Sequence, residues 1–213
     1  MADRPLVILG THALAPEVAD LAEQSGWRVD AFVENLDRAR CEHRIEGLPV
    51  VWVDELRDFR DTHLAVFGLG TTRRSRFIDE AADRGMSFAT IVHPTAVVSP
   101  RSTIGQGSVI GVRTVVAART AIGRHVLLNR GAMVCHHTEI GDYVSIQPGA
   151  MVAGKCRVGS GTWVGIGAMV SDGLTIGRDV LIGAGAVVIK DLPDAVQAVG
   201  VPAKVVKQGI SGR

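Results

Sequence analysis

The chain has 213 residues, of which 46% are hydrophobic and 21% charged, an ordinary balance for a globular protein. Its net charge of +1 excludes a general electrostatic attraction to nucleic acid or to an acidic membrane surface. The three cysteines lack CxxC spacing, which argues against a disulfide framework or a structural zinc site. There is no secretory pattern at the N-terminus and no apolar stretch near the ~20 residues of a membrane span, so we expect a cytoplasmic protein.

Strands and helices are predicted to alternate in the first part of the chain. Short apolar runs predict strands, and helical spacing of apolar residues predicts helices. The expected strands are 6–9, 29–33, 50–53 and 63–67, and the expected helices are 13–24 and 72–84. Strands separated by helices indicate a small parallel α/β sheet, shorter than a full dinucleotide-binding fold.

The hydrophobic period changes after His93-Pro94. From that point an aliphatic residue recurs every six positions without a slip, and an internal repeat of this kind indicates a solenoid. The repeating residues are Val98, Ile104, Ile110, Val116, Ile122, Leu128, Val134, Ile140, Ile146, Val152, Val158, Val164, Val170, Ile176, Ile182 and Val188.

Three six-residue units make one roughly triangular coil of 18 residues, whose strands stack on their equivalents at ~4.8 Å. The residue after the aliphatic one is often glycine, as corner turns with positive φ or close backbone approach require. We therefore predict an α/β domain over residues 1–92, followed by a left-handed parallel β-helix over 93–213.

Other features accompany the repeat. They are a glycine turn at Gly10 after the first strand, the junction Val-His-Pro-Thr-Ala at 92–96, Asn129 ahead of His136, and the ending Val-Gly-Val-Pro-Ala-Lys at 199–204. With them the chain resembles the hexapeptide-repeat acyltransferases over nearly its full length. Within these it is similar to the bacterial sugar acetyltransferases that have an N-terminal α/β domain, of the bacillosamine, perosamine and viosamine N-acetyltransferase type and the sialic acid O-acetyltransferase type.

The resemblance implies a function. It implies a homotrimer that binds acetyl-CoA in grooves between subunits, while the N-terminal domain binds a nucleotide-linked amino sugar. The expected reaction is N-acetylation by direct attack of the sugar amine on the thioester. Two alternatives stay open: O-acetylation of a sugar such as sialic acid, and a catalytically diverged β-helix that serves as a binding scaffold.

The resemblance also implies the site residues. His136 corresponds to the general base, and a histidine with a pKa near 6.5 is suited to accept a proton at neutral pH. Asn129 lies beside it in the family's site, and the Gly154 amide corresponds to the donor aimed at the thioester oxygen. Residues expected from it to bind the coenzyme are Gly154, Ile166, Ala184 and Pro202, and Lys190 and Lys204 are added because cations near the last coil suit the coenzyme's phosphates.

The chain departs from the family pattern at two positions. The acidic residue that usually follows the histidine is His137 here, and a second histidine nine residues on is Ser145. Either Glu139 or Asp142 supplies the orienting carboxylate, or the base is less activated. His137 is an alternative base.

A metal site and a thiol nucleophile are both disfavoured. Adjacent histidines on a strand point to opposite faces, so His136 and His137, even with His125, make a poor chelating set, and no metal is expected. Cys135 fits a small core position better than it fits a nucleophile.

Acceptor binding is expected at the carboxyl ends of the N-terminal strands. Ligands of parallel sheets bind at these ends, where helix N-termini face anions. The predicted substrate-binding residues are Gly10, Thr11 and His12 after the first strand, Glu34 and Asn35 after the second, and Gly70 and Arg73 near the fourth.

Overall fold

The computed structural model describes residues 4–213, which form two compact units, each with its own buried core. One unit contains the chain up to Gly70 together with Arg74–Ile91, and the other contains Thr71–Arg73 and Val92–Arg213. Among the described residues, no helix combines the length and the apolar character that crossing a bilayer requires.

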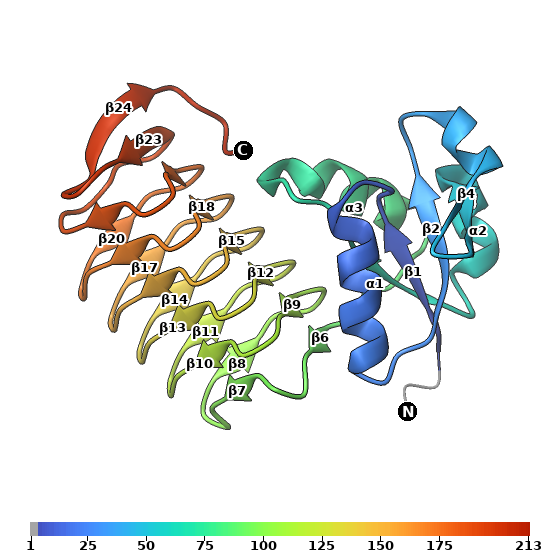
Figure 1. Ribbon diagram of the computed structural model, residues 1–213, viewed down its shortest axis with the longest axis horizontal. Helices are drawn as coiled ribbons and strands as arrows, with labels where there is room; N and C mark the ends of the chain where they lie inside the picture. Colours follow the sequence, from blue (N-terminus) through green and yellow to red (C-terminus); the bar gives the residue numbers. More distant parts are fainter. Residues whose placement is uncertain (1–3) are drawn as a thin grey trace. The chain divides into compact units, whose positions relative to one another are not determined.

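The first unit is a five-stranded sheet accompanied by helices (Figure 1). The strand order is β3-β4-β2-β1-β5, in which only the β3–β4 pair is antiparallel. The elements up to the second unit are β1 (Leu6–Leu9), α1 (Leu14–Gln24), β2 (Val29–Glu34), the 3₁₀ helix η1 (Arg38–Glu42), β3 (Arg44–Ile45), β4 (Leu48–Trp52), the 3₁₀ helix η2 (Val53–Glu55), α2 (Leu56–Phe59), β5 (Leu64–Phe67), the 3₁₀ helix η3 (Thr72–Arg74) and α3 (Ser75–Asp83).

The prediction of a small parallel α/β sheet is confirmed. Strand β1 is completely buried and β2 and β5 nearly so, as expected for continuous apolar runs in a parallel sheet. The β3–β4 hairpin was not predicted, because β3 has only two residues. Its turn residues Glu46 and Gly47 have φ of 50° and 78°, the left-handed pair that a two-residue hairpin needs.

The second unit is a parallel β-helix of two-residue strands with three faces (Figure 1). The first face contains β7 (Val97–Val98), β10 (Val115–Val116), β13 (Met133–Val134), β16 (Met151–Val152), β19 (Met169–Val170) and β22 (Val187–Val188). The second contains β8 (Thr103–Ile104), β11 (Ala121–Ile122), β14 (Glu139–Ile140), β17 (Arg157–Val158) and β20 (Thr175–Ile176). The third contains β6 (Ile91–Val92), β9 (Val109–Ile110), β12 (Leu127–Leu128), β15 (Ser145–Ile146), β18 (Trp163–Val164), β21 (Leu181–Ile182), β23 (Val196–Val199) and the antiparallel β24 (Lys204–Gln208).

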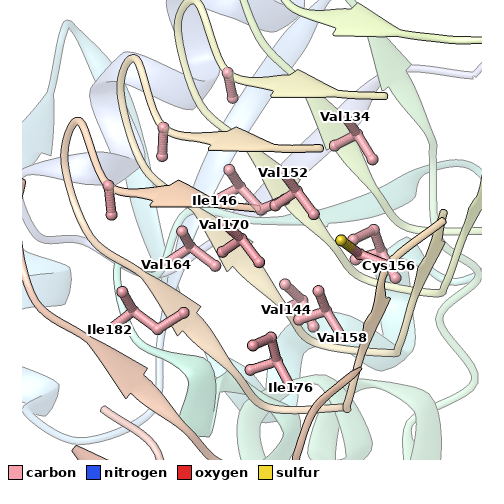
Figure 2. Close-up of a cluster of buried hydrophobic side chains, with 14 of the residues drawn as sticks. Val134, Val144, Ile146, Val152, Cys156, Val158, Val164, Val170, Ile176 and Ile182 are labelled. Atoms are coloured by element: carbon pink, nitrogen blue, oxygen red, sulfur yellow. The ribbon is translucent and has the colours of Figure 1, made fainter. Parts of the chain in front are cut away.

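The repeating aliphatic residues point inward and stack in columns. Figure 2 shows Ile146, Val164 and Ile182 of the third face near Val152 and Val170 of the first. From Ile110 to Val188 these side chains are at most 3% exposed. The β-helix prediction is therefore confirmed, and the aliphatic residue of each six-residue unit forms the core.

The glycines that follow the aliphatic residues serve close approach rather than positive φ. A Cβ at Gly159 would lie 2.6 Å from the backbone C and O of Gly177 in the next coil. Positive φ occurs two residues later in each unit from Ile104 to Ile182, for example at Arg119 and His137, where it is 58° in both. Residues other than glycine therefore also adopt the left-handed backbone conformation at regular intervals along the solenoid.

We predict that Gly159→Ala lowers the free energy of unfolding by about 1–3 kcal/mol, because its Cβ meets backbone that cannot move independently. In Gly154→Ala the Cβ meets only the imidazole of His136, an exposed side chain that can rotate, so the loss should be smaller. Urea unfolding of both variants checks this, and equal losses would contradict it.

Candidate active site

His136 and Gly154 occupy equivalent positions in consecutive coils, at the corner between the first and second faces. A Cβ at position 154 would lie 2.7 Å from His136 Cε1 and 3.0 Å from its Nε2. Only glycine leaves room for the ring there. The Gly154 N–H donates to no group within residues 4–213, so it is available to a ligand.

The side chain of His136 is held by its neighbour in the sequence. His136 Nδ1 lies 3.1 Å from His137 Nδ1, and the two rings are nearly perpendicular. His137 Nε2 lies 3.3 Å from the guanidinium of Arg119, one coil earlier. Arg119 was not predicted from the sequence, since it is eighteen residues from His137 and contacts it only through coil stacking.

Neither acid expected to orient His136 does so. Glu139 pairs with Arg157 at 3.6 Å on the second face. Asp142 lies at another corner, where it accepts hydrogen bonds from the Arg124 backbone N–H and guanidinium. Burial alone would raise the pKa of Asp142, but these bonds and the charge of Arg124 hold it below its usual value. The expectation that Glu139 or Asp142 replaces the missing carboxylate is therefore wrong for this arrangement, because His137 takes that place.

The corner between the third and first faces contains Asn129, Ile166 and Ala184. Ile166 and Ala184 are one coil apart and line a cavity of about 160 Å³ together with Trp163 and Arg213. Ile166 is 60% exposed, and the Arg213 guanidinium lies 4.2 Å from the centre of the Trp163 ring. This is an apolar groove with a cation at its edge.

Asn129 lies two coils before Gly165 at the same corner, and its side-chain oxygen accepts from the Arg130 N–H at 2.8 Å. Between them is Gln147, which the sequence analysis missed. Gln147 is 7% exposed, and its amide nitrogen has no hydrogen-bond partner within residues 4–213. An unsatisfied buried donor of this kind is available to a ligand.

The other predicted coenzyme residues lie toward the end of the solenoid. Lys190 is exposed at the corner of His136, three coils and roughly 14 Å further along at ~4.8 Å per coil. Pro202 lies in the loop whose Gly200 and Ala203 bond with Val187 of β22. Lys204 begins β24 and is exposed.

His136, Gly154 and Lys190 thus lie on one corner of the chain, and Asn129, Ile166 and Ala184 lie on another. The corners flank the first face, whose outward side chains are all apolar. They are Val97, Val115, Met133, Met151, Met169 and Val187, with Val97 65%, Met151 37% and Met169 40% exposed. One chain therefore does not bring His136 together with Ile166 and Ala184.

In the α/β unit, Gly10, Thr11 and Glu34 meet at the carboxyl ends of β1 and β2. Gly10 has a φ of 113°, and its N–H donates to Val33 O at 2.9 Å. The Thr11 hydroxyl donates to the carboxylate of Glu34. Both side chains are buried, so this cluster shapes the loops around the sheet edge.

The carboxylate of Glu34 is occupied by its own loop. Besides Thr11, it accepts from the backbone N–H groups of Asn35, Leu36 and Asp37 at 3.0, 2.7 and 3.3 Å. Burial alone would raise the pKa of Glu34, but these hydrogen bonds outweigh it and hold the pKa below its usual value. Glu34 thus holds the loop, although it was predicted to bind substrate.

Arg40 of η1 is a further candidate that the sequence analysis missed. Its guanidinium lies 3.3 Å from Thr11 Oγ1, which puts a cation at the carboxyl edge of the sheet. His12, which follows Thr11 in the sequence, is exposed. The side-chain amide of Asn35 donates to the carboxylate of Glu80 at 2.7 Å.

Gly70 is exposed after β5 in the first unit, whereas Arg73 belongs to the second unit. The Arg73 guanidinium donates to Ser211 at 2.7 and 3.1 Å. Within residues 4–213, no three histidine, cysteine, aspartate or glutamate side chains gather as a metal site.

We predict that Glu34→Gln destabilises the protein by about 1–3 kcal/mol at pH 7, because a charged acceptor of four hydrogen bonds is lost. The lowered pKa of Glu34 stabilises the fold above the ordinary value of 4.5, and this contribution disappears as the pH falls through the lowered pKa. Urea unfolding between pH 7 and pH 3.5 should show the two proteins converging toward acid. A difference that stays constant with pH would contradict the structural role of the carboxylate.

Comparison with known proteins identifies relatives of the whole chain. Residues 119–154 and 155–190 match the family model described as Bacterial transferase hexapeptide (six repeats). No curated protein sequence matches the chain significantly.

Several solved structures are similar over nearly the full length. Perosamine N-acetyltransferase (PerB) from Caulobacter crescentus, in complex with CoA and GDP-perosamine, has 35% identity and a TM-score of 0.88, covering 97% of this chain and 99% of its own. The acetyltransferase domain of PglB from Neisseria gonorrhoeae, in complex with acetyl coenzyme A, has 31% identity and a TM-score of 0.87, covering 96% and 100%. WeeI from Acinetobacter baumannii shares the fold, with 24% identity, a TM-score of 0.86 and coverage of 95% and 100%.

Proposed function

The chain belongs to the hexapeptide-repeat sugar acetyltransferases with an N-terminal α/β domain, and on this basis we propose that it N-acetylates a nucleotide-linked amino sugar of the 4-amino-4,6-dideoxy type. It is an acetyl-CoA-dependent acyltransferase. The observation that supports the proposal most directly is the exposed His136 ring packed on Gly154, with an unused backbone N–H beside it.

The reaction follows from these groups. The lone pair of the sugar amine attacks the thioester carbonyl carbon, and the carbonyl oxygen becomes an oxyanion. His136 takes the proton that the amine nitrogen must lose, a contribution of roughly 10²–10⁴-fold to the rate. The intermediate collapses, the C–S bond breaks, and the proton passes to the thiolate. The products are an amide and free coenzyme A, and no acyl-enzyme forms.

The Gly154 N–H is assigned to the oxyanion. A backbone donor held in a fixed place costs no reorganisation when the negative charge develops. Its position beside the His136 ring supports this role, since base and donor would then face the same carbonyl group.

The pantetheine arm of the coenzyme is assigned to the other corner, and its phosphates to the end of the solenoid. Ile166 and Ala184 offer apolar surface to the pantetheine arm, and Lys190, Pro202 and Lys204 lie toward the end of the solenoid, where cations suit phosphate groups. The nucleotide of the acceptor is assigned to the edge formed by Gly10, Thr11 and His12, where Arg40 offers a cation to its phosphates.

A homotrimer would complete the site. If the apolar first face of each chain turns toward a three-fold axis, the His136 corner of one subunit meets the Ile166 corner of the next. The exposed side chains of Met151 and Met169 support such contact, since a face whose outward side chains are all apolar is unusual on a monomer. Each of the three sites would then use residues of two subunits.

We predict that His136→Ala lowers kcat about 10²–10⁴-fold with a small effect on the KM for acetyl-CoA. A panel of nucleotide-linked 4-amino-4,6-dideoxy sugars, GDP-perosamine included, provides the acceptors, and hydroxyl sugars test O-acetylation. His43→Ala, an exposed histidine of the α/β unit, is the matched control and should keep wild-type kcat. A kcat for His136→Ala within a few-fold of wild type would reject the base, and calorimetry showing no coenzyme A binding at millimolar ligand would favour a scaffold.

The shared site predicts complementation between inactive variants. His136→Ala damages one corner, and Ala184→Trp fills the groove at the other. Co-expression with two different tags and purification on both yields mixed trimers, in which about one site in three combines two intact corners. These trimers should therefore regain about a third of wild-type kcat.

In the control, the double variant His136→Ala, Ala184→Trp is co-expressed with His136→Ala in place of the single variant Ala184→Trp. Every site of these mixed trimers lacks the histidine, so they should stay inactive. Mixed trimers that remain inactive with the single variants would contradict a site shared between subunits.

A further inference from the structure

Arg119, His137 and His136 form a continuous chain of side chains at one corner of the solenoid. Arg119 and His137 both have a left-handed backbone with φ of 58°, and they occupy equivalent positions in consecutive coils. The guanidinium lies 3.3 Å from His137 Nε2, and His137 Nδ1 lies 3.1 Å from His136 Nδ1.

The donor at one end of this chain decides where the ring protons lie. A guanidinium has N–H donors and no acceptor, so His137 Nε2 must accept from Arg119. A neutral His137 then carries its proton on Nδ1 and donates it to His136 Nδ1. A neutral His136 in turn carries its own proton on Nε2.

This tautomer is the wrong one for a base. The His136 Nε2 has no hydrogen-bond partner within residues 4–213, so it is the nitrogen available to a substrate. In the arrangement described, that nitrogen is an N–H donor, while the lone pair of Nδ1 is used by His137. A general base needs the lone pair on the nitrogen that faces the amine.

We propose that Arg119 is a positioning residue that acts through His137 and holds His136 in the tautomer with a protonated Nε2. His136 becomes a base when His137 leaves Arg119: the His137 Nδ1 proton passes to His136 Nδ1, the His136 Nε2 proton passes to water, and His137 Nε2 takes a proton from water. His136 then carries its proton on Nδ1, donates it to His137 Nδ1, and accepts the amine proton at Nε2. This inference rests on the proposed function only for its effect on the rate.

Other charged side chains lie on the same corner or close to it in the sequence. Lys155 occupies the position equivalent to His137 in the next coil, so cations lie before and after it in the column. Glu139 is paired with Arg157 on the second face, and Asp172 occupies the position equivalent to His136 two coils further on. Among residues 4–213 no carboxylate contacts His136 or His137, so Arg119 is the charged group that meets the pair.

The test is to reverse the hydrogen-bonding character of position 119. Arg119→Glu supplies only acceptors, so His137 should carry its proton on Nε2 and His136 on Nδ1. Arg119→Lys supplies only donors and should keep the wild-type tautomers. Arg178→Glu makes the same charge change at an exposed arginine on the corner between the second and third faces, away from both corners of the proposed site, and should also keep them.

Long-range ¹H–¹⁵N correlation spectra of histidine-labelled protein at a pH above the histidine titration report the tautomers directly. Signals are assigned from His136→Ala and His137→Ala. We expect protonated Nε2 for His136 and protonated Nδ1 for His137 in the wild type, and the reverse in Arg119→Glu. The same His136 tautomer in the wild type and in Arg119→Glu would overturn the proposal.

Activity separates this inference from the proposed function. We expect kcat of Arg119→Glu at pH 7 to rise on the order of tenfold, within the range of general-base effects. Arg119→Lys and Arg178→Glu should stay within about twofold of wild type, a small part of that range. A tautomer switch without a rise in kcat would support the positioning role of Arg119 and contradict His136 as the base.

Discussion

The stacking of one coil on the next is the constraint on which the rest of the second unit depends. Each two-residue strand bonds to the strand eighteen residues later, so equivalent positions lie in columns about one strand spacing apart. The columns decide what every side chain touches. They place His136 on Gly154 and His137 beside Arg119, and they require glycine wherever two coils approach too closely for a Cβ.

The triangular cross-section has a second consequence for the proposed chemistry. A triangle has three separate corners, and residues on different corners of one chain stay apart however well the core is packed. His136 lies on one corner and Ile166 on the next, with an apolar face between them. This geometry favours a site between subunits, because a neighbouring copy can bring the second corner to the first without changing the fold of either.

The replacement of a carboxylate by His137 changes more than one contact. A carboxylate accepts a proton from the catalytic histidine and favours the charged ring, whereas a histidine can donate or accept. Which of these it does depends on its other nitrogen, which faces Arg119. In the proposed arrangement the tautomer of His136 is therefore set by Arg119 on the preceding coil. Glu139 and Asp142 do not take part, because each is paired with an arginine elsewhere.

The sequence by itself determined the architecture of this protein, because a core must be filled at the period of its own backbone. The six-residue repeat of aliphatic residues has one compatible solenoid, and the apolar runs of β1, β2 and β5 have one compatible kind of sheet. Only the tertiary structure decided which polar groups meet. Arg119 and His137 are exposed and eighteen residues apart in the sequence. Glu34 was predicted to bind substrate, but its carboxylate accepts four hydrogen bonds from its own unit. Arg40 lies in a 3₁₀ helix that no sequence pattern predicted. Burial leaves a periodic trace in the sequence, whereas contacts between surface side chains depend on turn geometry and coil stacking, which leave none.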